Sequence, residues 1–231
     1  MLKERLREMI FGAAPAPAAL DRDSGRAFLS FDDGEPTGRE RHSHGLDQFF
    51  GVMRGQPGQP ILDLGEINQN NVSFITDLGY KLYSEDFLRE LDLFYGSGPG
   101  AIAGHSDARR ASGFLDHALG YAPNQFGGVV VWDALQCLAK PLLGRVVERL
   151  HQVLRPHGCL LALFHTDEKA STMPVYSYRI GGPRTLMFSP KGDRRAAQAF
   201  NNRGIERLFQ DFASVKFFLT RDRLREVIVR R

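Results

Sequence analysis

The stretch that decides the fold runs from residue 126 to residue 165 and reads FGGVVVWDALQCLAKPLLGRVVERLHQVLRPHGCLLALFH. Its β-branched run at residues 129–131 predicts a buried strand. Residues 141–156 carry leucine and valine at helical spacing, and Pro141 and Pro156 mark the two ends of that helix. The apolar run at residues 159–165 predicts a second strand. Strand, helix and strand in this order indicate a parallel sheet covered by helices.

The same alternation continues toward the N-terminus. Residues 61–65, ILDLG, predict a short buried strand, and residues 81–86, KLYSED, predict another. Between them, residues 71–79 predict a helix that ends near Gly79. Residues 44–55 predict one more helix, which Gly55 stops. The fold class that follows is α/β, Rossmann-like and mostly parallel, with helices on both faces of the sheet.

The C-terminal part follows a different pattern. Residues 177–190 predict two strands that turn at the Gly-Gly-Pro of residues 181–183, and residues 201–212 predict a helix. Residues 215–220 and 224–231 predict a closing antiparallel hairpin. A hairpin that finishes an otherwise parallel sheet is an unusual ending for a Rossmann dehydrogenase.

Composition places this chain among ordinary globular proteins. The 231 residues are 42% hydrophobic and 25% charged, with a net charge of +3. We expect an N-terminal extension, residues 1–43, with an amphipathic helix, an Ala/Pro linker and a short strand within residues 26–33. One domain, residues 44–231, follows it. Cys137 and Cys159 lie in apolar runs and are expected to be core residues, which favours a reducing, cytoplasmic location.

Several partners are disfavoured by the sequence. No apolar stretch approaches the roughly 20 residues that span a bilayer, so no membrane partner is expected. His42 and His44 have no carboxylate at metal-ligand spacing, so we expect no metal. The C-terminal third is rich in arginine, which indicates either a solvated surface or an anionic partner. Nothing in the sequence indicates an oligomeric state.

These segments, in this order, resemble the class I S-adenosylmethionine-dependent methyltransferases over about residues 44–231. ILDLG is similar to the family's first strand and its acidic-x-Gly loop, and Asp86 follows Asp63 by 23 residues, a usual family separation. Residues 114–138 resemble the stretch that holds the third-strand acid and the fourth strand. Residues 150–164 resemble the family's L-x-P-G-G turn, with His157 in place of one glycine. The resemblance implies a seven-stranded sheet with a C-terminal antiparallel hairpin, S-adenosylmethionine as cofactor and a small-molecule substrate.

The resemblance also implies a set of cofactor-binding residues at the carboxyl ends of the strands. They are Asp63, Gly65, Glu66, Asn68, Asp86, Asp116, His117 and Trp132. Asp86 would accept hydrogen bonds from the ribose diol, with Glu85 as the alternative if the strand register differs by one. Asp116 and His117 would lie at the adenine, although Asp116 also suits a helix or turn cap. Trp132 is either a wall of the substrate opening or a core residue.

The methyl-donor loop departs from the family pattern. Ile67 and Gln69 stand where the family has its second and third glycines. A β-branched isoleucine at positive φ is an outlier, so the loop either follows another path or binds the donor in another way. Asn68 and Asn70 tolerate left-handed conformations and suit a tight turn. This departure keeps a non-catalytic, methyltransferase-like binding module open as the alternative function.

Two further features bear on chemistry. His165 ends the last predicted parallel strand, where it would be either a general base or a surface histidine. The glycine cluster at residues 95–104 mimics a phosphate loop but lacks its Lys-Ser/Thr ending, so we interpret it as a flexible loop. A nucleic-acid substrate is the least favoured hypothesis, because the base-flipping signature of the Asn-Pro-Pro-Tyr type is missing.

Overall fold

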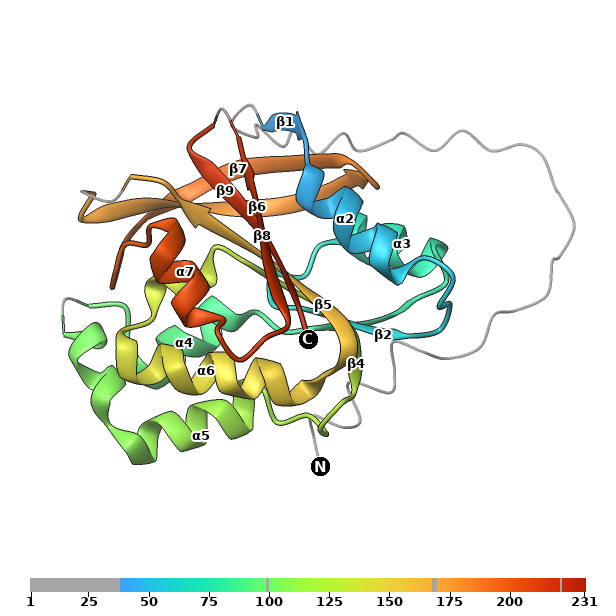
Figure 1. Ribbon diagram of the computed structural model, residues 1–231. Coiled ribbons are helices and arrows are strands. Elements are labelled where there is room, and N and C mark those ends of the chain that lie inside the picture. Colours follow the sequence, from blue (N-terminus) through green and yellow to red (C-terminus); the bar gives the residue numbers. More distant parts are fainter. Residues whose placement is uncertain (1–37, 99, 168–169, 221) are drawn as a thin grey trace, which may run out of the picture. The chain divides into compact units, whose positions relative to one another are not determined.

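The computed structural model describes residues 38–98, 100–167, 170–220 and 222–231 (Figure 1). The helix, the linker and the strand expected within residues 1–33 lie outside this range. A six-stranded sheet has the order β3-β2-β4-β5-β9-β8. Its strands are β2 (Pro60–Asp63), β3 (Lys81–Ser84), β4 (Phe126–Trp132), β5 (Leu154–His165), β8 (Ser214–Leu219) and β9 (Leu224–Arg230).

The pairing of the strands makes this sheet mostly parallel. β2 pairs in parallel with both β3 and β4, and β4 pairs in parallel with β5. β9 runs antiparallel to both of its neighbours, β5 and β8. The predicted mostly parallel α/β sheet is confirmed, whereas the predicted number of seven strands is wrong for the described residues, which form six.

The sequence explains why the described residues lack a seventh strand. The segment between the second and third helices of the parallel unit forms a short 3₁₀ helix, Ala101–Ser106, instead of a strand. Ile102 is the only β-branched residue in that segment, and glycines dominate residues 96–104. Such a composition disfavours extended structure.

A second, three-stranded sheet has the order β1-β7-β6 and is antiparallel throughout. It consists of β1 (Arg39–His42), β6 (Thr172–Gly182) and β7 (Thr185–Arg195). The strand pair predicted within residues 177–190 is confirmed and extends well beyond them in both directions. β1 lies within the expected N-terminal extension, residues 1–43, and is held by its register with β7, for example Arg41 opposite Leu186.

Helices cover both faces of the large sheet (Figure 1). One face carries α4 (Phe87–Tyr95), α5 (Ala108–Ala118), α6 (Lys140–Val153) and α7 (Asn202–Leu208), and the other carries α2 (His44–Met53) and α3 (Gln69–Asp77). The predicted helices at residues 44–55, 71–79, 141–156 and 201–212 are therefore confirmed. No helix in the described part of the chain combines the length and apolar character needed to cross a bilayer.

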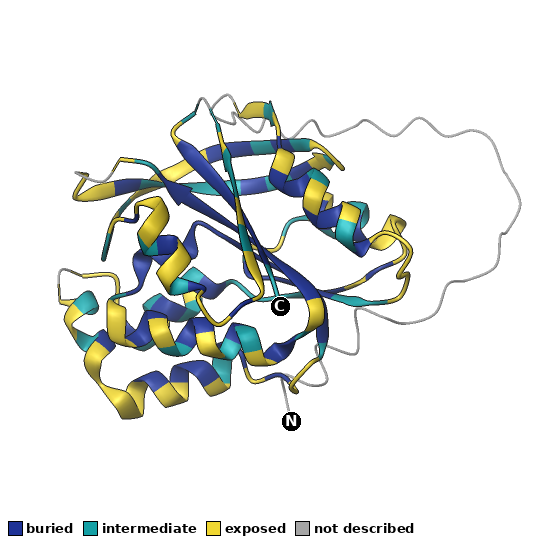
Figure 2. Cartoon of the chain, viewed as in Figure 1, coloured by how far each residue is buried: buried dark blue, intermediate teal, exposed yellow. Residues whose placement is uncertain are grey.

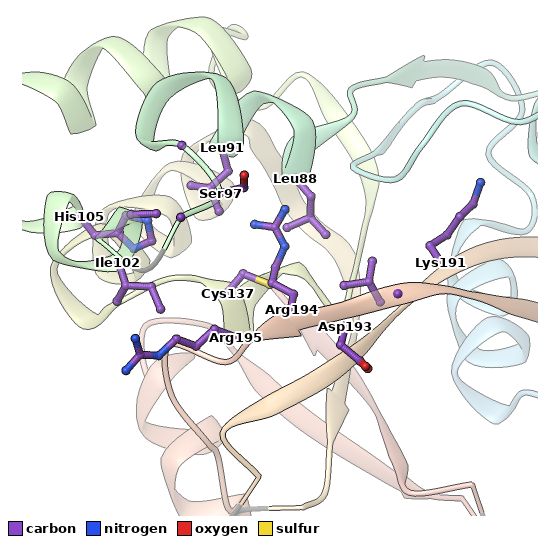
Figure 3. A pocket seen from close by; sticks show the side chains of 15 residues that line it. Leu88, Leu91, Ser97, Ile102, His105, Cys137, Lys191, Asp193, Arg194 and Arg195 are labelled. Carbon is purple, nitrogen blue, oxygen red and sulfur yellow. The ribbon is translucent and has the colours of Figure 1, made fainter.

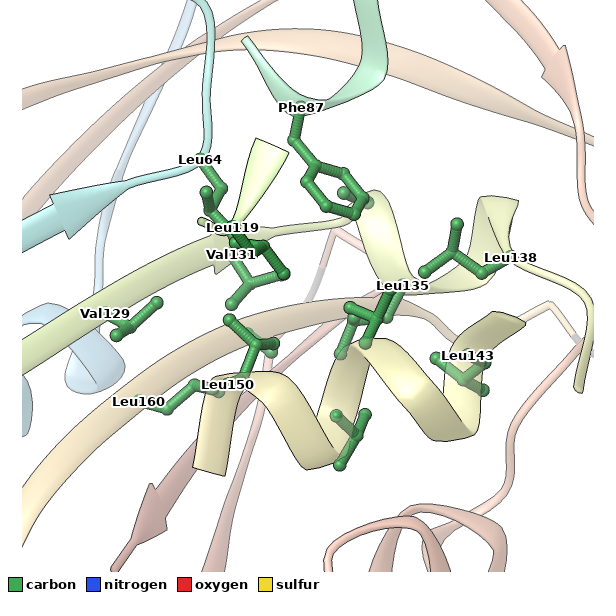
Figure 4. Close-up of a cluster of buried hydrophobic side chains, with 14 of the residues drawn as sticks. Leu64, Phe87, Leu119, Val129, Val131, Leu135, Leu138, Leu143, Leu150 and Leu160 are labelled. Atoms are coloured by element: carbon green, nitrogen blue, oxygen red, sulfur yellow. The ribbon is translucent and has the colours of Figure 1, made fainter. Parts of the chain in front are cut away.

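Alternation along the strands divides the core into two layers. Val129 and Val131 pack toward α4–α7, whereas Val130 and Trp132 pack toward α2 and the three-stranded sheet. The central strands are dark blue in Figure 2 because both of their faces are buried. Figure 4 shows side chains of β4 and β5 gathered with Leu143 and Leu150 of α6. Each large apolar side chain buried in this way contributes about 1.5–3 kcal/mol.

Candidate functional site

The site lies at the carboxyl ends of the parallel strands, where the chain leaves β2 for β3 on one side and β4 for β5 on the other. Ligands of open α/β sheets bind at such a topological switch point. Three cavities open there. We call them the switch-point cavity, of about 420 Å³, the glycine-loop cavity, of about 510 Å³, and the His165 cavity, of about 380 Å³.

The switch-point cavity is lined by four of the eight predicted cofactor residues. Gly65 and Glu66 line it from the loop after β2, and Asp86 lines it from the start of α4. Trp132 and the neighbouring Asp133 line it from the end of β4. The antiparallel strand β6 closes the cavity with Tyr176 and Tyr178.

Asp63 organises the floor of this cavity. It is buried and accepts hydrogen bonds from Trp132 Nε1 at 2.6 Å, from the Gly65 amide at 3.0 Å and from Asn71 Nδ2 at 3.2 Å. Burial raises the pKa of Asp63 above its ordinary value, although these three hydrogen bonds act in the opposite direction. Because both carboxylate oxygens are engaged within the chain, Asp63 holds the loop in place beneath the cavity.

The Trp132 indole covers Gly65. A Cβ atom on Gly65 would lie 2.6 Å from Trp132 Nε1 and 2.8 Å from Cδ1, closer than real Cβ contacts. The indole also stacks on Tyr178, with 4.9 Å between ring centroids and 4° between planes. Trp132 has φ +53, an outlier for a bulky residue, and such strain concentrates at functional sites. The chain's own tryptophan thus occupies the space in front of Gly65.

The loop after Gly65 follows a path without left-handed residues. None of residues 66–70 has positive φ, which explains why Ile67 and Gln69 are tolerated where glycine was expected. Ile67 is 61% exposed, and Gln69 begins α3. Asn68 caps that helix by accepting the Asn71 amide at 2.9 Å, and its own amide donates to the Tyr178 carbonyl at 3.0 Å. Asn68 therefore connects the loop to β6.

Asp86 lines the switch-point cavity, whereas Glu85 is not among its lining residues. The side chain of Asp86 caps α4, because Oδ1 accepts the Arg89 amide at 3.2 Å. This bond uses one oxygen of the carboxylate at the rim of the cavity. Asp86 thus lines the cavity as expected, and its role toward a ribose stays a prediction.

Asp116, expected as the acid of a third strand, does not follow a strand, and His117 was expected beside it at the adenine. Both residues lie on α5, and neither lines any of the three cavities. Buried Ala111, Phe114, Leu115 and Ala118 recur at helical spacing along this segment. Asp107 caps the helix and Asp116 does not. His117 Nε2 lies 2.6 Å from Glu90 Oε2 and connects α5 to α4.

Sequence reasoning missed the glycine-loop cavity (Figure 3). Gly96, Ser97 and Gly98, from the cluster interpreted as a flexible loop, line it together with His105. Figure 3 shows Leu88 and Arg194 between the His105 side and the Lys191 side. This cavity shares three lining residues with the switch-point cavity, namely Leu88, Val175 and Lys191. The glycine cluster was the signal that could have found it.

His105 ties this second cavity to α6. Its imidazole is buried, accepts the Ala139 amide at Nδ1 over 3.0 Å, and meets Tyr95 edge to face at 4.7 Å. Burial lowers the pKa of His105 below its ordinary value of 6.5. The neutral ring is therefore the form that the fold stabilises.

We predict that stability falls with acidification because His105 must be neutral. A depressed pKa adds stability that is fully present above the ordinary imidazole pKa and is lost as the pH falls through the lowered one. The urea midpoint of His105→Gln, which keeps an acceptor for Ala139, should depend less on pH between roughly pH 7.5 and pH 5. Burial also lowers the pKa of His151, so part of the dependence remains. An unchanged pH dependence in His105→Gln would refute this role.

His165 ends β5, as predicted, but it faces the His165 cavity and not the switch-point cavity. Its Nε2 lies 3.2 Å from Asp133 Oδ2, and the Tyr178 hydroxyl donates to the same oxygen at 2.8 Å. Burial, followed by the charge of Asp133, raises the pKa of Tyr178 well above its ordinary value, so its hydroxyl stays protonated. Asp133 thus connects β4, β5 and β6.

Burial also determines the chemistry of the two cysteine thiols. Cys137 and Cys159 are buried, which confirms them as core residues, and burial raises the pKa of each thiol to about 12. Neither is an active nucleophile at neutral pH. Among the described residues, no three His, Cys, Asp or Glu side chains are arranged to hold a metal ion.

Solved structures with a similar fold include S-adenosylmethionine-dependent methyltransferases. The 1,6-didemethyltoxoflavin-N1-methyltransferase of Burkholderia thailandensis, solved with 1,6-didemethyltoxoflavin and S-adenosylhomocysteine, is similar at 11% identity and a TM-score of 0.42, over 82% of this chain and 79% of that one. A methyltransferase of Methanosarcina mazei is similar at 15% identity and a TM-score of 0.43, over 76% of this chain and 93% of that one. A glycopeptide N-methyltransferase complexed with S-adenosylmethionine is similar at 14% identity and a TM-score of 0.40, over 81% of this chain and 94% of that one. No family model and no curated protein matches the sequence.

The residues present fit one half of S-adenosylmethionine. The Asp86 carboxylate at the cavity rim and the apolar Leu88 and Leu93 beside it suit a ribose and its base. The methionine end does not fit while the Trp132 indole covers Gly65. Binding of the whole cofactor therefore requires that the indole leave this position.

Proposed function

We propose that this chain is an S-adenosylmethionine-dependent methyltransferase that acts on a small molecule, with the cofactor in the switch-point cavity. The observation that carries this proposal is the Asp86 carboxylate, which faces that cavity from the carboxyl end of β3. A carboxylate in this place can accept both hydroxyls of a ribose. When bound, the cofactor supplies an electrophilic methyl group.

The chain's own residues orient and enclose the reactants. Asp86 and Leu88 hold the nucleoside, and β6 excludes water from the cavity with Tyr176 and Tyr178. Methyl transfer depends above all on the alignment of the two reactants. His165, oriented by Asp133, is the proposed acceptor of the proton that the substrate loses.

We predict that Asp86→Ala weakens S-adenosylhomocysteine binding by about 1.5–3 kcal/mol, roughly 10- to 150-fold, because hydrogen bonds to the charged carboxylate are lost. Isothermal titration calorimetry measures this effect. Asp86→Asn preserves the helix cap and removes only the charge, so its loss of affinity separates binding from folding. Glu85→Ala is the register control and should bind normally.

Two outcomes would contradict the proposal. If Glu85→Ala weakens binding while Asp86→Ala does not, the ribose carboxylate has been assigned one position too late. If the native chain fails to bind S-adenosylhomocysteine at millimolar concentration, the chain is not a methyltransferase of this type.

A further inference from the structure

The His165 cavity adjoins the switch-point cavity but has its own walls. Tyr176 of β6 lines both cavities, and Asp133, which lines the switch-point cavity, is hydrogen-bonded to His165 on the other side. Residues from β1, β5, β6 and the turn before β9 surround the His165 cavity. The two cavities therefore meet at the Tyr176 ring and the Asp133 carboxylate.

Two arginines face this cavity without an acidic partner among the described residues. Four charged side chains line it, namely Arg39, Asp167, Asp222 and Arg223. Asp222 is already paired with Arg41, at 2.6 Å, and Asp167 also has a partner. Within the described part of the chain, no acid pairs with Arg39 or Arg223, and both are exposed. Arg223 has φ +62, an uncommon conformation for a residue other than glycine.

The inner end of the cavity offers a single oriented imidazole. The Nε2 atom of His165 is hydrogen-bonded to Asp133, and the His165 backbone amide donates to Gln136 Oε1 at 2.6 Å. The other ring nitrogen has no partner among the described residues. Since Asp133 fixes which nitrogen carries the proton, the remaining nitrogen can accept one from a ligand. The cavity therefore combines guanidinium groups at its rim with a proton acceptor at its inner end.

We propose that the His165 cavity is the substrate site, and that it takes a small organic carboxylate carrying a hydroxyl or an amine. The carboxylate lies against Arg39 and Arg223, because guanidinium groups bind carboxylates through paired hydrogen bonds. The hydroxyl or amine lies toward His165. A volume of about 380 Å³ restricts the ligand to a small molecule. This inference rests on the proposed function and adds the substrate class to it.

The test uses two matched probes, 4-hydroxybenzoate and its uncharged analogue 4-hydroxybenzamide, with the full chain. Ligand-observed NMR titration should show that the carboxylate binds about tenfold tighter than the amide. Arg39→Gln combined with Arg223→Gln should abolish this preference and leave S-adenosylhomocysteine affinity unchanged. Arg54→Gln, at an exposed arginine outside the three cavities, is the matched control and should retain the preference.

The outcomes separate the two proposals. Equal binding of the two probes, binding that survives loss of both arginines, or no binding of either probe overturns the substrate-site inference. In each case, normal S-adenosylhomocysteine binding leaves the proposed function intact. Conversely, a chain that binds 4-hydroxybenzoate through the two arginines but does not bind S-adenosylhomocysteine retains the carboxylate cavity and loses the methyltransferase proposal.

Discussion

Gly65→Ala is expected to displace the Trp132 indole and to lower the free energy of unfolding by about 1–3 kcal/mol, the usual range for an overpacked core. The new methyl group would lie 2.6 Å from Nε1 and 2.8 Å from Cδ1 of Trp132. The indole cannot yield by a small shift, because it stacks on Tyr178 on one side and donates to Asp63. One methyl group should therefore open the contact between the loop and β6.

Fluorescence gives a direct measurement, because Trp132 is the only tryptophan in the chain. Its emission should move to longer wavelength in Gly65→Ala as the indole leaves its buried position, and urea titration gives the change in stability. Gly51→Ala is the matched control, since no atom lies within 4 Å of the added methyl group in α2. That change should be neutral or stabilise by about 0.5–1 kcal/mol. Native emission and native stability in Gly65→Ala would show that the indole does not occupy the space over Gly65.

The parallel part of the fold could be predicted because its signal is local. A strand buried on both faces requires consecutive apolar residues, and residues 129–131 and 159–164 show this without reference to any other part of the chain. The helix between them is marked by the spacing of its leucines and valines. His157, within β5, has φ +64, which shows why histidine can replace one glycine of the family's L-x-P-G-G pattern, since histidine is among the residues enriched at positive φ.

The family resemblance led to a wrong prediction where the local pattern of residues indicated a helix. Residues 108–118 carry helical apolar spacing and an N-terminal aspartate, yet Asp116 was assigned to a strand because the family has an acid near that place. The prediction of a seventh strand and the placement of Asp116 and His117 at the adenine come from this same error. The glycine cluster that lines the second cavity was dismissed for lacking a motif, although its position after α4 placed it near the strand ends.

The central contacts of the site are long-range and could not be read from the sequence. Trp132 and Tyr178 meet only because β6 belongs to a separate sheet that packs over the switch point. No spacing in the sequence indicates that Asp133 joins His165 to Tyr178. The place of Asp86 at the cavity could be predicted from the sequence, because it depends on the register of β3 and on the start of α4, both of which are local.

The buried cluster that joins the two sheets is expected to have the largest effect on stability. Arg41 of β1 reaches Glu226 of β9, with Nη1 2.7 Å from Oε1, and the Glu226 side chain is fully buried. Glu226 also accepts the Gly45 amide at the start of α2. Arg41→Met would leave this carboxylate buried without its cation, which lowers the free energy of unfolding by about 3–5 kcal/mol.

A double-mutant cycle tests this expectation. Glu226→Gln keeps an oxygen for Gly45 and removes the charge, so Arg41→Met with Glu226→Gln should recover most of the stability lost in Arg41→Met alone. Arg184→Met is the matched control, because its ion pair with Asp47 is exposed, with 64% of the arginine side chain accessible. Removing such a surface pair changes stability by about 0–1 kcal/mol. If urea unfolding gives the same small change for Arg41→Met as for Arg184→Met, Glu226 is not held as a buried charge by Arg41. In that case, the three-stranded sheet that closes the site must be fixed to the large sheet by its other contacts, such as the hydrogen bond from Tyr178 to Asp133.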